Sequence, residues 1–139
     1  MSVFLDTNVL VYLFDADAPE KQALARATFE RLVLEGQVLL STQVLQELYV
    51  TVTRKLAVPL GFDEALEVVR ELAQLPMVQV DGPMVLKAIQ LSQRYGFSFW
   101  DALIVQAALA GGAELLLTED LQHGQLIAGL RIENPFQNH

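Results

Sequence analysis

Four acidic residues stand beside apolar runs of the sequence, where a carboxylate is costly unless its charge is compensated. They are Asp6, Glu47, Asp101 and Asp120. Taking an unpaired charge out of water costs several kcal/mol, and carboxylates brought together repel one another. A hard cation such as Mg²⁺ or Mn²⁺ relieves both costs, because it prefers oxygen ligands and keeps several waters. The residue types therefore predict a divalent metal site, and the chemistry that suits it best is hydrolysis of phosphodiester bonds.

The elements around these acids predict an α/β fold. Short, mostly apolar segments read as strands buried on both faces, which is typical of a parallel sheet flanked by helices. We expect four to five short strands, at residues 2–5, 37–40, 77–80 and 114–117, with a shorter candidate at 130–132. Helical patterns fill the intervals, at residues 8–14, 17–36, 41–57, 63–75, 81–96 and 98–110.

This order of elements brings the acids toward one edge of the sheet. In an open parallel sheet, sites form beyond the carboxyl ends of the strands. Asp6 ends the first strand, Glu47 lies in the second turn of the helix after the second strand, and Asp120 follows the fourth strand. Asp101 joins them if the helix that Ser98 opens begins at the same edge.

Each acid also has a local explanation, which the sequence leaves open. Asp6 has the position of an N-cap for the helix that begins near Asn8. Ser98 and Asp101 have the spacing of a capping box. Asp120 fits an ordinary turn, and Glu47 fits a solvated helix face. Taken together these explanations weaken, because all four acids flank runs apolar enough to be core.

Composition narrows the class of protein. The chain has 139 residues, 53% of them hydrophobic, which predicts one domain spanning residues 1–139. It has no cysteine, which excludes disulfides, thiolate zinc sites and cysteine nucleophiles, and two histidines are too few for a three-histidine zinc site. The longest uncharged stretch, residues 102–113, is too short to span a bilayer, and the N-terminus lacks a basic signal region. We therefore expect a cytoplasmic protein with no membrane segment.

The charge balance gives no direct sign of a nucleic-acid partner. The net charge is −8, from 17 acids and 9 bases, so the chain as a whole has no basic footprint. If metal ions neutralise the four candidate ligands, the remaining 13 acids face 9 bases. That balance is compatible with RNA. Arg54, Lys55 and Arg94 are the candidate RNA contacts, although each also fits a solvated surface.

The motifs around these acids resemble the PIN-domain family, and most closely its VapC-type toxin ribonucleases. Residues 4–8, Phe-Leu-Asp-Thr-Asn, resemble the first family motif, with Asp6 as metal ligand and Asn8 as a supporting residue. Glu47, Asp101 and Asp120 stand at the second, third and fourth acidic positions, and Thr118 is similar to the residue that organises hydrogen bonds at the site. The resemblance spans nearly the whole chain, in order.

The resemblance implies an activity and partners. Family members of this kind are Mg²⁺- or Mn²⁺-dependent ribonucleases, so the expected catalytic and metal-binding residues are Asp6, Glu47, Asp101 and Asp120. The expected partners are an RNA substrate, a small cognate antitoxin protein and a second copy of the chain. Tyr49, Val50 and Val52 make one helix apolar on more than one face, which agrees with a homodimer.

Other acid-rich α/β proteins fit less well. A phosphoacceptor receiver domain needs a lysine after a late strand, and none follows Lys87. A haloacid-dehalogenase-like phosphatase needs a second aspartate where Asn8 stands. A Ser–His–Asp hydrolase would have to use His123, and there is no nucleophile-elbow motif, so we predict that His123 is a loop residue. We predict that Trp100 packs in the core beside the site. A non-catalytic PIN-like regulatory or RNA-binding module and a magnesium-dependent phosphohydrolase stay open as alternatives.

Overall fold

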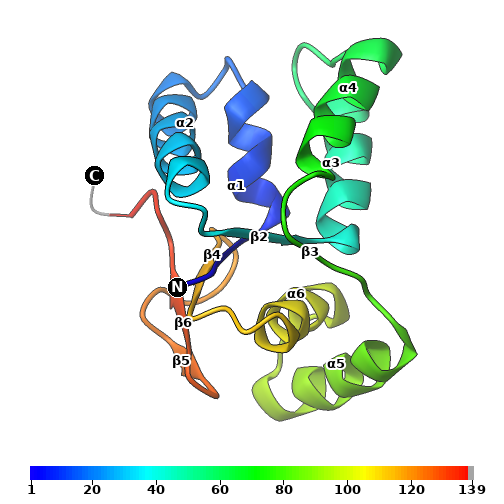
Figure 1. The fold of residues 1–139 in the computed structure, drawn as a ribbon, viewed down its shortest axis with the longest axis vertical. Helices are drawn as coiled ribbons and strands as arrows, with labels where there is room; N and C mark the ends of the chain where they lie inside the picture. The colour runs from blue at the N-terminus through cyan, green and yellow to red at the C-terminus, as the bar shows by residue number, and fades with distance from the viewer. Residues whose placement is uncertain (138–139) are drawn as a thin grey trace.

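The computed structural model describes residues 1–137 and places strand β1 near the middle of a six-stranded sheet (Figure 1). The strand order is β3-β2-β1-β4-β6-β5. All neighbouring strands are parallel except β5 and β6, which are antiparallel. The strands are β1 (Val3–Leu5), β2 (Val38–Ser41), β3 (Met77–Val78), β4 (Leu115–Leu117), β5 (Leu126–Ile127) and β6 (Leu130–Glu133).

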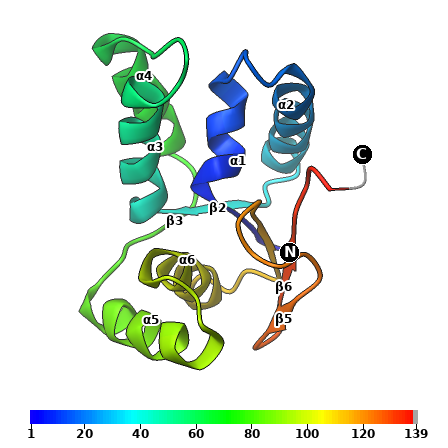
Figure 2. The same cartoon turned by 180° about the vertical axis from the view of Figure 1, so that it is seen from behind.

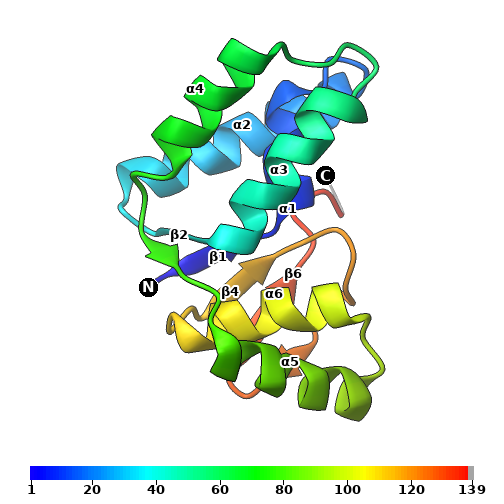
Figure 3. The ribbon, with the colours of Figure 1, turned by 90° about the vertical axis from the view of Figure 1, so that its right-hand side faces the viewer.

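Helices cover both faces of this sheet. Figures 1 and 2 show one group of helices on each side of the sheet, and Figure 3 shows the two groups separated by the sheet. The first group is α1 (Thr7–Val11) with the short 3-10 helix η1 (Tyr12–Phe14), α2 (Pro19–Leu34), α3 (Thr42–Arg54) and α4 (Phe62–Leu72). The second is α5 (Gly82–Tyr95), which packs against α6 (Phe99–Ala110). The predicted α/β class, a mostly parallel sheet flanked by helices, is confirmed.

The core forms because the strands are apolar on both faces. Every residue of β1 is buried, as is every residue of β2. Each of these strands therefore needs cover above and below, which the two helix groups provide. Helix α6 is buried along most of its length, from Ala102 to Ala108 apart from Gln106.

The predicted number of strands was too low by at least one. The structure has a sixth strand, β5, which pairs with β6 through a two-residue turn, Ala128 and Gly129. Both turn residues have positive φ, 49° and 87°, as tight hairpins require. The usual Asn-Gly or Asp-Gly signal is missing from this turn, so the hairpin left no clear mark in the sequence.

Element ends differ from prediction by a few residues. The helix expected to reach residue 57 ends at Arg54, and the strand expected over 77–80 is only Met77–Val78. Gly96 closes α5 as predicted, in the left-handed conformation with φ 74°. The polar tail expected at the C-terminus ends in Asn138 and His139, which lie outside the described residues. Within residues 1–137, no helix combines the length and the apolar character that crossing a bilayer requires.

Candidate metal centre

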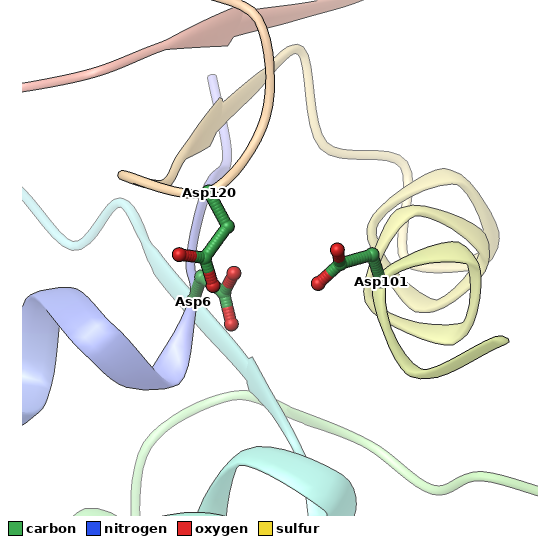
Figure 4. A group of neighbouring side chains, drawn as sticks. All are labelled: Asp6, Asp101 and Asp120. Carbon is green, nitrogen blue, oxygen red and sulfur yellow. The ribbon is translucent and has the colours of Figure 1, made fainter. Parts of the chain in front are cut away.

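Three aspartates from three distant segments meet at the carboxyl edge of the sheet (Figure 4). Asp6 follows β1, Asp120 follows β4, and Asp101 lies in the first turn of α6. One carboxylate oxygen from each lies within 4.8 Å of the others. Asp6 is buried, Asp101 is half-buried and Asp120 is exposed. The group of carboxylates is therefore accessible to solvent on the side of Asp120.

Asp6 is the most constrained of the three. It caps α1, where its Oδ1 accepts a hydrogen bond from the Thr7 backbone N–H at 2.7 Å. Its Oδ2 accepts from the Thr118 hydroxyl at 2.8 Å. Each carboxylate oxygen has two lone pairs, so both can still accept a second partner. The capping role considered from the sequence is therefore present and leaves room for a ligand.

Burial raises the pKa of Asp6 to about 7. Desolvation is the largest cause, and the hydrogen bonds from Thr118 and Thr7 oppose it without cancelling it. The negative charges of Asp120 and Glu47 raise the pKa further. A carboxylate in this state is stabilised by a nearby cation, since the cation favours its charged form.

Thr118 and Asn8 form the hydrogen-bond frame that holds the first and last aspartates. Thr118 Oγ1 donates to Asp6 and accepts from the Asp120 backbone N–H at 3.1 Å. Asn8 Nδ2 donates to Thr118 Oγ1 at 3.4 Å, and Asn8 Oδ1 accepts from the Glu119 backbone N–H at 3.2 Å. Of the two predicted supporting residues, Thr118 contacts Asp6 and the Asp120 backbone directly, whereas Asn8 acts through Thr118 and the Glu119 backbone.

Asp101 is positioned by the cap of its helix. Ser98 is the N-cap of α6, and its Oγ accepts from the Asp101 backbone N–H at 3.1 Å. The cap thereby uses the backbone of Asp101 while its carboxylate faces Asp6 and Asp120 (Figure 4). Burial raises the pKa of Asp101, and the charges of Asp120 and Glu47 add to this, against a hydrogen bond from Ser98.

Glu47 lies in the same cavity but outside the three-oxygen group. Its Oε1 accepts from the Thr7 hydroxyl at 2.7 Å, and its Oε2 accepts from Gln43 Nε2 at 3.4 Å. It is close enough to raise the pKa of Asp6 and of Asp101 by its charge. The structure therefore brings three of the four predicted acids within one ion's reach and holds the fourth beside them through Thr7 and Gln43.

A second cluster of side chains anchors the loop that carries Asp120. Glu119 accepts hydrogen bonds from the Tyr12 hydroxyl at 2.7 Å and from the Lys21 ammonium. Lys21 also lies over the rings of Tyr12 and Phe136. Burial alone would raise the pKa of Glu119, but the hydrogen bonds from Lys21 and Tyr12 outweigh it and the pKa is lowered. Glu119 is thus held as an anion that points away from its neighbour in sequence.

The three aspartates lie in a cavity of about 710 Å³ between α1, α3 and the start of α6. Among the lining residues in the described part of the chain, 1–137, Lys55 carries the one positive charge. His123 does not line it; the His123 Nδ1 accepts from the Asn134 backbone N–H at 3.0 Å, in the loop where we predicted it.

The prediction that Trp100 packs in the core is wrong. Trp100 lines this cavity and 61% of its surface is exposed. It occupies the first turn of α6, ahead of the buried part of the helix. The buried face of α6 begins two residues later, at Ala102.

Two cavity residues were missed by the sequence reasoning. Thr7 and Gln43 each bond the Glu47 carboxylate, and Gln43 also bonds the Trp100 backbone carbonyl at 3.1 Å. The spacing of Gln43 and Glu47, four residues apart on one helix, is a signal that the sequence contained. The contact with Trp100 joins positions 57 residues apart, which local spacing does not reveal.

The donor set fits a small, hard divalent cation. The three nearby donors are all carboxylate oxygens, the ligands that Mg²⁺ and Mn²⁺ prefer. Oxygens bound to one Mg²⁺ at about 2.1 Å lie roughly 3 to 4 Å apart, so small side-chain movements would bring this group onto one ion. The raised pKa of Asp6 is a cost that such an ion would remove.

Comparison with known families and structures shows where this fold has been seen before. The family model described as PIN domain matches residues 3–126. A toxin–antitoxin complex from Klebsiella pneumoniae contains a chain that is 20% identical, with a TM-score of 0.72, over 97% of this chain and 98% of that one. A DNA-bound VapBC complex from Salmonella typhimurium contains one that is 24% identical, with a TM-score of 0.66, over 97% and 98%.

A third similar structure is VapC20 of Mycobacterium tuberculosis, described as a sarcin-ricin loop cleaving toxin. It is 21% identical, with a TM-score of 0.64, over 83% of this chain and 87% of that one. Comparison with the curated proteins found no match. At these identities the solved structures establish a shared fold along nearly the whole chain.

Proposed function

The chain belongs to the PIN domain family, and we propose that it is a metal-dependent endoribonuclease acting as the toxin of a type II toxin–antitoxin pair. The observation that carries the proposal is the group of three carboxylate oxygens within 4.8 Å at the sheet edge. Similar folds in toxin–antitoxin complexes and in a sarcin-ricin loop cleaving toxin support the substrate class and the partner.

In this proposal, Asp6, Asp101 and Asp120 hold Mg²⁺ or Mn²⁺, with Glu47 beside them as the fourth acidic residue. When bound, the metal would lower the pKa of a coordinated water and stabilise charge on the leaving oxygen. Thr118 keeps Asp6 oriented through its hydroxyl, and the Asp120 backbone is tied to the same oxygen. Glu47, held by Thr7 and Gln43, is placed to accept a proton or to orient water at the edge of the group.

The burial of the residues around the carboxylates determines from which side a substrate can reach them. Asp6 and Thr118 are buried, whereas Asp120 is exposed, so the carboxylates are open to solvent on the side of Asp120. We propose that a polymer lies across this opening while its reacting phosphate enters. This arrangement suits an internal phosphodiester bond, as endonucleolytic cleavage requires.

The test is cleavage of single-stranded RNA by the purified protein. We expect cleavage with Mg²⁺ or Mn²⁺ that stops in EDTA, and loss of most of the rate in Asp6→Asn, because an amide binds the cation poorly. Asp17→Asn makes the same change on an exposed side chain outside the cavity and serves as the matched control. Cleavage that persists with metal shown to be absent would contradict the mechanism, and RNA binding without cleavage would favour the non-catalytic alternative.

The expected partners extend this proposal. We expect a small antitoxin to bind the protein and suppress cleavage. A homodimer is the expected oligomer, with the exposed Tyr49 and Val50 on α3 as candidate contacts, whereas Val52 on the same helix is fully buried. Sedimentation of the parent and of Val50→Asp tests this, since a charge placed in an apolar contact should favour the monomer.

A further inference from the structure

Trp100 is a large apolar side chain that the fold leaves exposed beside the aspartates. It is 61% exposed, lines the cavity and directly precedes Asp101 in the chain. The three aspartates line the same cavity, so a ligand that covers Trp100 from the cavity side lies near the aspartate group. Exposing an indole costs hydrophobic stabilisation, which indicates a ligand that covers it.

The structure holds this ring in place. Gln43, which is 4% exposed, donates from Nε2 to the Trp100 carbonyl at 3.1 Å. The ring of Phe99 meets the Trp100 ring edge-on, with centroids 5.1 Å apart.

 The angle between the two ring planes is 74°. Ser98 fixes the start of the helix through its cap. The backbone around Trp100, which lines the cavity, is therefore tied at both sides, so little ordering is needed when a ligand binds.

The surroundings favour a nucleobase over a protein side chain as the ligand. Protein interface cores are depleted in charged residues, whereas the cavity that Trp100 lines also contains Gln43, Glu47, Asp101 and Asp120. An unpaired base offers a flat π face for the indole and polar edges for these groups. Stacking of bases on aromatic rings is the common way in which proteins hold unpaired RNA.

We propose that Trp100 stacks against an unpaired nucleobase next to the phosphate that is cleaved, so that the substrate is single-stranded at that point. The inference rests on the proposed ribonuclease function and adds to it a residue that contacts the substrate. A base inside a duplex is covered on both faces by its neighbours and cannot meet the ring without being unstacked. Double-stranded RNA should therefore bind poorly.

The chain offers a direct readout, because Trp100 is its one tryptophan. The experiment titrates the Asp6→Asn protein, which should not cleave, with a short single-stranded RNA in Mg²⁺ and follows tryptophan fluorescence. We expect saturable quenching by the single strand and much less by the same sequence annealed to its complement. Among single strands that each carry one abasic site, one position should lose most of the quenching.

Substitutions test whether the ring contributes to binding. Base stacking supports about a 5- to 100-fold loss of RNA affinity in Trp100→Ala, measured with a labelled RNA. Trp100→Phe should retain most of the affinity. Phe62→Ala removes an aromatic side chain of similar exposure, 65%, that does not line the cavity, and should bind as the parent does.

The outcomes separate this inference from the proposed function. Quenching by single-stranded RNA in a protein that never cleaves RNA would support stacking and refute the ribonuclease. Metal-dependent cleavage by Trp100→Ala with the parent's affinity and rate would overturn stacking and leave the ribonuclease intact. RNA that binds tightly without changing the fluorescence would also overturn stacking.

Discussion

Replacing Asp6 by asparagine should make the metal-free protein more stable at neutral pH while it abolishes activity. Asp6 is 4% exposed, and its pKa is raised from 3.8 to about 7, mainly by desolvation. The folded chain therefore binds this proton more tightly than the unfolded chain does. It follows that the contribution of Asp6 to the free energy of unfolding is most favourable at low pH and is lost as the pH rises from about 4 to about 7.

The size of the effect follows from the shift. Each pKa unit corresponds to about 1.4 kcal/mol, so the ionised carboxylate destabilises the metal-free fold by about 4 kcal/mol once the pH exceeds 7. Asparagine has no charge to desolvate. It does replace the Oδ2 that accepts from Thr118 by an amide N–H₂, which costs about 1 kcal/mol at every pH. We therefore expect a slightly less stable variant at pH 4 and one about 3 kcal/mol more stable at pH 7.

The assay is urea unfolding in EDTA at several pH values between 4 and 8. Parent and variant are compared at each pH, because the titration of all other groups then largely cancels. A difference of about 3 kcal/mol corresponds to roughly 10 °C in Tm for a chain of this size. Asp17→Asn, an exposed carboxylate changed in the same way, provides the baseline. Adding Mn²⁺ should stabilise the parent more than Asp6→Asn, because only the ligand-bearing fold gains from binding.

The dependence of the stability difference on pH distinguishes a lost hydrogen bond from a desolvated charge. A lost hydrogen bond changes stability by the same amount at every pH, whereas a desolvated charge changes it only where the group ionises. A variant that is less stable than the parent by a constant amount from pH 4 to pH 8 would falsify the view that Asp6 is a strained, uncompensated carboxylate in the metal-free protein.

Three further predictions concern the loop, the helix and the sheet around the site. Asp101→Asn should also raise stability in EDTA at neutral pH, because burial and the charge of Asp120 raise the pKa of Asp101, and RNA cleavage should fall steeply. If the variant lost stability but still cleaved RNA, Asp101 would be only a helix-turn residue. Lys21→Met removes the ammonium that holds Glu119, so Mn²⁺ affinity by calorimetry should weaken by up to about tenfold, and unchanged affinity would mean that Asp120 needs no such anchor. Gly111→Ala would place a Cβ 2.5 Å and 2.7 Å from core side chains of β2 and β3, so thermal unfolding should show a loss of roughly 1–3 kcal/mol, and a stability equal to the parent's would show that these side chains can move aside.

The placement of three acids at one edge follows from the order of elements alone. Asp6 and Asp120 follow parallel strands, and the helix that carries Glu47 leaves the same edge, because the carboxyl ends of parallel strands coincide. Asp101 obeys the same rule in reverse. Helix α6 precedes the parallel strand β4, so it must run back across the sheet and begin at the carboxyl edge. The order of elements along the chain therefore already implied that the helix opened by Ser98 begins at the same edge as the other acids.

Local patterns were also enough for the caps and for most strands. The caps at Asp6, Ser98 and Gly96 depend on backbone groups only a few residues away, so a short window of sequence contains both partners. The hairpin at Ala128 and Gly129 was not predicted from the sequence, because its turn uses an alanine at positive φ, a conformation that alanine seldom adopts.

Tertiary structure alone decided which side chains around the cavity are exposed and which are joined by hydrogen bonds. Helix α6 is apolar nearly all round, so its sequence contains no sign that Trp100 is exposed while Ala102 is buried. Glu47 stands apart from the three aspartates because Thr7 and Gln43 hold it, and one of these contacts joins residues 40 positions apart. Periodicity reports the faces of one element. Exposure and side-chain pairing depend on where the neighbouring elements end, and only the packed fold determines that.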